Sequence, residues 1–143
     1  MNHSIIKQLV VAAVVCVCGA VPTVPVAAET EAPVTIPNTS AGIWQAVDSH
    51  MQELHAAIAQ GKLNTMHQHA YAVRDLVRSL PSHSANLPAE ALAKVTAQTK
   101  FVDTLAERLD QTGDANDKAG TESNVSKLEG VLKTIRDQYT SSR

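Results

Sequence analysis

Four segments of the chain place apolar residues in steps of three and four, and this spacing is the strongest constraint on its fold. Such steps put side chains on one face of an α-helix, which turns once in about 3.6 residues. Residues 64–80 show the pattern most clearly, in a heptad-like seam that includes Met66, Ala70, Val73 and Val77. No segment alternates apolar and polar residues with the period of a β-strand. The sequence therefore predicts an all-α fold.

Capping and turn residues set the ends of the first two predicted helices. The first helix is expected over residues 41–60, with Ser40 as its N-cap and Gly61 as its stop. The second ends at Pro81, because the residue before a proline avoids the helical region. A polar connection then leads to Pro88, which suits the first turn of a third helix.

The last two segments complete a set of four helices. The third helix is predicted to close at Gly113, and the fourth to start between Asp114 and Thr121. Short connections make successive helices antiparallel neighbours. We therefore expect residues 41–143 to form an antiparallel up-down-up-down four-helix bundle.

The N-terminus has the pattern of a secretory signal peptide. Lys7 precedes an apolar run over residues 8–21, and small residues follow up to Ala28. The run is shorter than the about 20 residues that a membrane span needs. We therefore expect a signal peptide over residues 1–28, a flexible leader over residues 29–40, and a secreted protein with the periplasm as its compartment.

Composition excludes several classes of function. The only two cysteines, Cys16 and Cys18, lie in the expected signal peptide, which leaves the rest without disulfides or thiolate metal sites. The formal net charge is −2 and no basic block is present, so we expect no binding to nucleic acid or to a membrane after cleavage. No nucleophile elbow or other catalytic signature occurs, and we expect no enzymatic activity.

Histidine and methionine gather where the first two predicted helices meet, in residues 50–70, HMQELHAAIAQGKLNTMHQHA. A turn at Gly61 would bring the flanks of the two helices together. Two imidazoles and one or two thioethers are a ligand set that suits Cu(I). The sequence therefore predicts a soft-metal accessory protein that binds copper, with four candidate ligands: Met51, His55, Met66 and His69.

The same residues also fit a hairpin without metal. Met66 lies on the apolar seam, where it would fill the core, and His55 and His69 lie at or beyond the seam edges. His67 and His69 point to different sides of a regular helix, so the HQH motif cannot chelate there. His50 falls inside the apolar stripe of the first helix, and we expect it to be a core residue that donates to a buried acceptor.

Two aromatic residues lie off the predicted seams. Phe101 is on the flank of the third helix opposite its seam, and Trp44 is at the edge of the first helix's stripe. Apolar groups in such positions either cover the edges of a bundle or form a docking surface. The alternative function is therefore a structural or protein-interaction module without a cofactor, which binds a partner or a second copy through Trp44 or Phe101.

Two short stretches resemble the secreted bacterial b-type cytochromes that are built as four-helix bundles. Residues 132–139, LKTIRDQY, are similar to that family's last helix, and Met51 in HMQEL is similar to its first-helix methionine ligand. The resemblance implies a four-helix bundle, with haem binding as a third and less favoured function. The family's second ligand is a histidine near the end of the chain, whereas Thr140 follows Tyr139 here. Only the fold therefore carries over.

Overall fold

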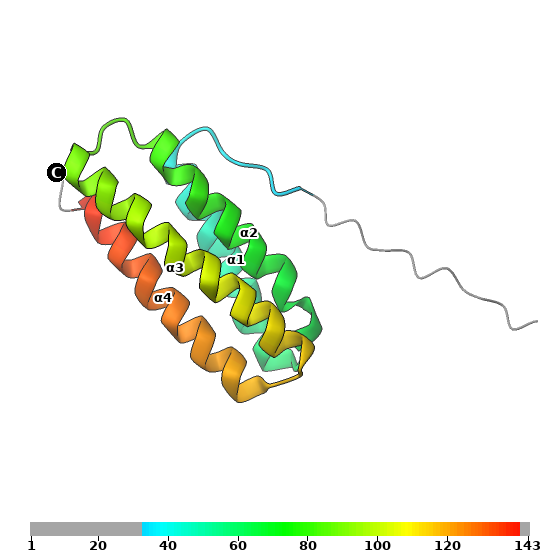
Figure 1. The fold of residues 1–143 in the computed structure, drawn as a ribbon. Coiled ribbons are helices and arrows are strands. Elements are labelled where there is room, and N and C mark those ends of the chain that lie inside the picture. Colours follow the sequence, from blue (N-terminus) through cyan, green and yellow to red (C-terminus); the bar gives the residue numbers. More distant parts are fainter. Residues whose placement is uncertain (1–32, 141–143) are drawn as a thin grey trace, which may run out of the picture. The chain divides into compact units, whose positions relative to one another are not determined.

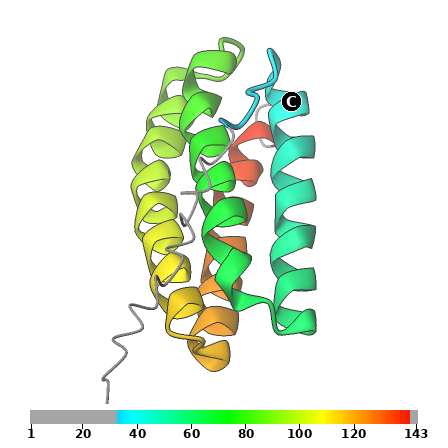
Figure 2. The same cartoon turned by 90° about the vertical axis from the view of Figure 1, so that its right-hand side faces the viewer.

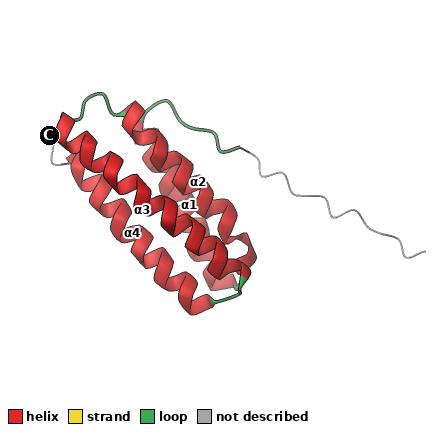
Figure 3. Ribbon diagram, viewed as in Figure 1, coloured by secondary structure: helices red, strands yellow, loops and turns green. Residues whose placement is uncertain are grey.

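The computed structural model describes residues 33–140, and this part of the chain is all-helical, as predicted. The expected signal peptide, residues 1–28, lies outside the described residues. No strand occurs in residues 33–140 (Figure 3). The elements in chain order are α1 (Ser40–Gln60), the 3-10 turn η1 (Leu63–Thr65), α2 (Met66–Ser79), the 3-10 turn η2 (Leu80–His83), α3 (Ala89–Asp114) and α4 (Lys118–Thr140).

The four long helices lie side by side (Figures 1 and 2). α2 packs against both α1 and α3, and α4 packs closely against α3. α1 and α4 also touch, but less extensively than the other neighbouring pairs. Among the described helices, none combines the length and the apolar character that crossing a membrane requires.

One apolar core joins the four helices. Each helix contributes side chains that are removed from solvent, among them Ile43 and Leu54 of α1, Met66 and Leu76 of α2, Leu109 of α3, and Leu128 and Ile135 of α4. Burial of a side chain of this kind contributes about 1.5–3 kcal/mol to the free energy of unfolding. Val34 and Ile36, which belong to the predicted leader, also pack against this core.

The ends of α1 show how the sequence sets the helix boundaries. Gly61 follows the last helical residue with a φ of 68°, a left-handed conformation that a residue without Cβ adopts at little cost. This confirms Gly61 as the stop. The N-cap is Thr39 rather than Ser40, because Thr39 Oγ1 accepts a hydrogen bond from the Gly42 amide at 3.1 Å.

Gly113 lets the turn between α1 and α2 sit directly on α3. It lies inside α3, one residue before the end of the helix, and it is buried. A Cβ at this position would lie 2.5 Å from the carbonyl oxygen of Leu63 in η1, and 3.1 Å from Cβ of Met66. Only glycine allows so close an approach of two backbones. The contact fixes the start of α2, and with it the residues that face α1.

Candidate metal centre

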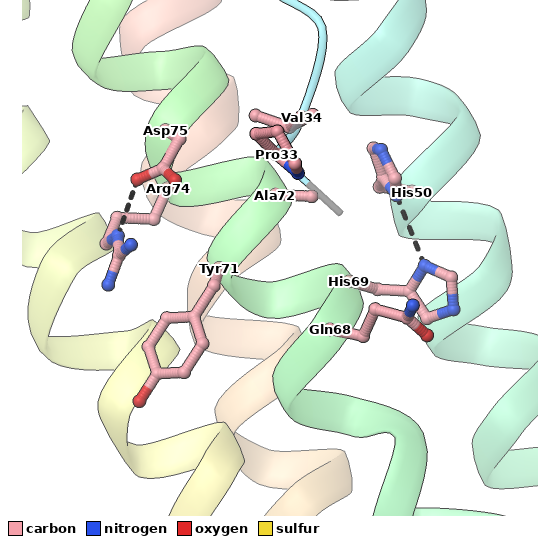
Figure 4. Close-up of a pocket in the computed structure, with 9 residues that line it drawn as sticks. All are labelled: Pro33, Val34, His50, Gln68, His69, Tyr71, Ala72, Arg74 and Asp75. Carbon is pink, nitrogen blue, oxygen red and sulfur yellow. Dashed lines mark hydrogen bonds and ion pairs between the residues drawn. The ribbon is translucent and has the colours of Figure 1, made fainter. Parts of the chain in front are cut away.

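Two histidines face each other across the groove between α1 and α2. His50 of α1 and His69 of α2 direct their Nδ1 atoms at one another, 3.1 Å apart (Figure 4). Their ring centroids are 5.4 Å apart, and the ring planes are inclined by 45°. Both side chains are partly buried. This pair is the strongest candidate for a functional site in the described part of the chain.

The positions of both histidines follow from the apolar seams that flank them. His50 lies one turn after Val47 and one turn before Leu54, and both of these residues are buried in the core. His69 occupies the equivalent place on α2, between Met66 and Val73. Each imidazole therefore lies at the edge of its seam, and the antiparallel turn at η1 brings the two edges together.

The 3.1 Å distance between the two Nδ1 atoms fits a hydrogen bond between two neutral imidazoles. An Nδ1–H of one ring donates to the lone pair of the other, whereas two protonated rings would direct N–H groups at each other. Burial and the charge of His69 both lower the pKa of His50 below its ordinary value of 6.5, and Glu53 opposes this effect. His50 therefore favours its unprotonated form, which is the form that binds a metal ion.

The histidines border an open cleft of about 400 Å³ on the surface of α2 (Figure 4). Its charged and phenolic groups already have partners: Arg74 Nε donates to Asp75 at 2.8 Å and its guanidinium lies over the ring of Tyr71, while the Tyr71 hydroxyl donates to Asp110. The complete lining is Pro33, Val34, His50, Gln68, His69, Tyr71, Ala72, Arg74 and Asp75. The two imidazoles are the histidine side chains at this cleft, and each has the other as its partner.

The structure does not bring the four predicted ligands together. His69 is in the histidine pair, and Met66 is fully buried in the core, as the metal-free alternative expects. His55 lies on the α4 side of α1, where its Nε2 is 2.8 Å from Oε1 of Glu129, and both side chains are about half exposed. Met51 lines a shallow groove between α1 and α4.

Helix geometry explains this separation. His50 and His55 are five positions apart, which is about 140° around a helix. When one of them faces α2, the other must face elsewhere. In the hairpin His50 contacts His69 of α2, whereas His55 contacts Glu129 of α4.

The expectation that His50 is a core residue with a buried acceptor is wrong. Its side chain is only partly buried, and its partner is the imidazole of His69 rather than an acceptor in the core. The apolar stripe on α1 is narrower than the sequence pattern indicates, so position 50 lies at its edge. One signal in the sequence could have identified the pair: each of the two histidines has seam residues three positions before it and four positions after it.

Within the described residues, no further acidic, thiol or imidazole ligand joins the pair. In residues 33–140, no group of three or more His, Cys, Asp or Glu side chains is arranged to hold a metal ion. Met51 and Met66 are both buried in the core, and Met51 also lines the groove between α1 and α4. A metal ion bound between the two rings would meet two imidazole donors, one from each helix.

The two proposed docking residues differ in accessibility. Trp44 is only 9% exposed, packs edge-on against Tyr139 with ring centroids 5.8 Å apart, and lies under the guanidinium of Arg136. It therefore offers little surface to a partner. Phe101 on α3 is 56% exposed.

The C-terminal end of α4 provides no second haem ligand at the position that the cytochrome resemblance emphasises. The hydroxyl of Thr140 donates to the carbonyl of Asp137, and the hydroxyl of Tyr139 is hydrogen-bonded to Ser84 at 2.7 Å. Neither residue has an imidazole or thioether donor.

Comparison of the chain with protein-family models, with curated proteins and with solved structures finds no match. The site must therefore be interpreted from its own geometry.

Proposed function

We propose that this chain is a secreted, periplasmic, non-enzymatic protein that binds copper or a related transition metal through His50 and His69. The observation that carries the proposal is the pair of opposed Nδ1 atoms, 3.1 Å apart, on two different helices. Neutral imidazole nitrogen is a good ligand for copper and zinc. Export is supported by the signal-like pattern of residues 1–28.

We further propose that the four helices form an up-down-up-down bundle. The short connections at η1 and around Asn116 support this topology, since each joins helices that pack against each other. In such a bundle α1 and α2 are antiparallel neighbours, and a metal ion between His50 and His69 would link them. Metal binding should therefore stabilise the fold.

Thermal denaturation with and without metal tests the proposal. We expect Cu(I), kept reduced under anaerobic conditions, to raise the Tm of the purified protein. An ion at 100 times its Kd adds about 2.7 kcal/mol to the free energy of unfolding. In a domain of this size each kcal/mol moves Tm by about 4–8 °C, so the shift should be on the order of 10 °C. The Tm is also measured with Zn(II), Ni(II) and Cu(II).

Histidine variants identify the ligands in the same experiment. His50→Ala and His69→Ala should each abolish the shift. His55→Ala is the matched control, since His55 lies on the same helix but faces Glu129, and it should keep the full shift. The proposal fails if no metal ion moves the Tm, or if the His55 variant alone loses the effect.

The second candidate is a protein-interaction module without a cofactor. It rests on Phe101, whose side chain is 56% exposed and could contact a partner. A protein that binds no metal and forms a dimer that Phe101→Asp dissociates would support this candidate. Haem binding is the least supported of the three, because residues 118–140 contain no histidine.

A further inference from the structure

Two distances between the imidazole rings, from Nδ1 to Nδ1 and from centroid to centroid, together define how the rings are oriented. Each Nδ1 lies about 1.15 Å from the centroid of its own five-membered ring. Two rings whose Nδ1 atoms point straight at each other across 3.1 Å would therefore have centroids about 5.4 Å apart. The observed separation of the centroids is 5.4 Å. The lone-pair directions of His50 and His69 thus lie nearly on one line.

Opposed donors favour one coordination geometry over the others. An ion between two donors in line would be coordinated at about 180°. A tetrahedral ion needs its donors at about 109°, so each ring would have to swing away from the common line. A square-planar ion could take the two nitrogens in trans positions, but it would need two further donors. A linear site needs only that the nitrogens separate from 3.1 Å to about 4 Å, which is twice a typical metal–imidazole bond.

The number of donors points to the same geometry. The described residues place no third acidic, thiol or imidazole side chain at the pair. Zn(II) and Cu(II) usually take four ligands or more, and two protein donors leave their coordination half complete. Monovalent ions with a filled d shell are satisfied by two ligands in line.

We propose that His50 and His69 bind one monovalent soft ion, Cu(I) or its analogue Ag(I), in linear two-coordinate geometry. This inference rests on the proposed function, in which the pair binds a metal. In the metal-bound pair both rings carry their single proton on Nε2, so the ring that donates through Nδ1–H in the metal-free pair changes tautomer, and both Nδ1 lone pairs face the ion. No proton is released from a neutral pair, and the partly buried site gains one positive charge rather than two. The charge of Glu53, one turn further along α1, favours a cation at His50.

X-ray absorption spectroscopy of the purified protein with one equivalent of Cu(I) tests this geometry. We expect a fit to two nitrogen donors, and the intense pre-edge feature that linear Cu(I) gives. Ag(I), which is not oxidised in air, should compete with Cu(I) for the site. Zn(II) and Cu(II) should bind at least 100-fold more weakly than Cu(I).

The controls separate this inference from the proposed function. His50→Gln and His69→Gln should lose the two-nitrogen signature, while helicity by circular dichroism confirms that they fold; His55→Gln should retain it. If the fit requires three or four donors, or sulfur, or if a divalent ion binds more tightly than Cu(I), the linear site is refuted while metal binding by the pair stands. If none of these ions binds, both proposals are refuted.

Discussion

At the scale of single residues, the metal site depends on which histidine faces which helix. The sequence shows that His50, His55 and His69 flank the first turn of the fold, but one residue corresponds to about 100° of helix rotation. An error of one position in the seam edge changes the partner of a side chain. This is why the sequence identified His69 as a candidate but paired it with His55, whereas the structure pairs it with His50.

The lowered pKa of His50 predicts how the metal-free protein responds to acid. The unfolded chain binds a proton at His50 near pH 6.5, while the folded protein does so only at lower pH. Between these two values the unfolded state holds more protons, so the free energy of unfolding falls as the pH falls. The contribution of His50 to the free energy of unfolding is therefore largest above pH 6.5. We expect His50→Gln to reduce this loss, measured by urea denaturation at several pH values between 5 and about 7.5. Equal slopes in the two proteins would contradict the pKa assignment.

At the scale of elements, the sequence predicted the existence and the order of the helices well, and their ends less well. Gly61 was identified correctly because few other residues adopt a positive φ at a helix end. Gly113 was taken as the end of the third helix, yet it lies inside α3. Its role is to admit the backbone of Leu63, a contact between segments far apart in the chain, and no local pattern reveals such a contact.

Two glycines with equally open surroundings should respond to alanine in opposite ways. A Cβ would meet nothing within 4 Å at Gly61 or at Gly130. Gly61→Ala should lower the free energy of unfolding by about 1 kcal/mol, because φ is 68° there. Gly130→Ala, in the exposed middle of α4, should raise it by up to about 1 kcal/mol through helix propensity. Denaturant melts of both variants measure the signs, and the same sign in both would contradict the capping role of Gly61.

At the scale of the whole molecule, the all-helical fold followed from the apolar spacing, but the assembly of the site did not. The site needs the register of α1 against α2, which depends on η1, on the contact between Gly113 and Leu63, and on the shared core. These are tertiary features. The result is a hairpin that holds two imidazoles in line across one groove, in a part of the chain without cysteine.

The most direct test of the account follows the histidine side chains themselves. In ¹⁵N-labelled protein titrated with Ag(I), the Nδ1 resonances of His50 and His69 should shift together and saturate at one ion per chain. In the complex both rings should carry their proton on Nε2, and the resonances of His55, His67 and His83 should keep their positions. A shift at His55 in place of His50, or no shift at any histidine, would contradict the claim that these two residues are the metal ligands.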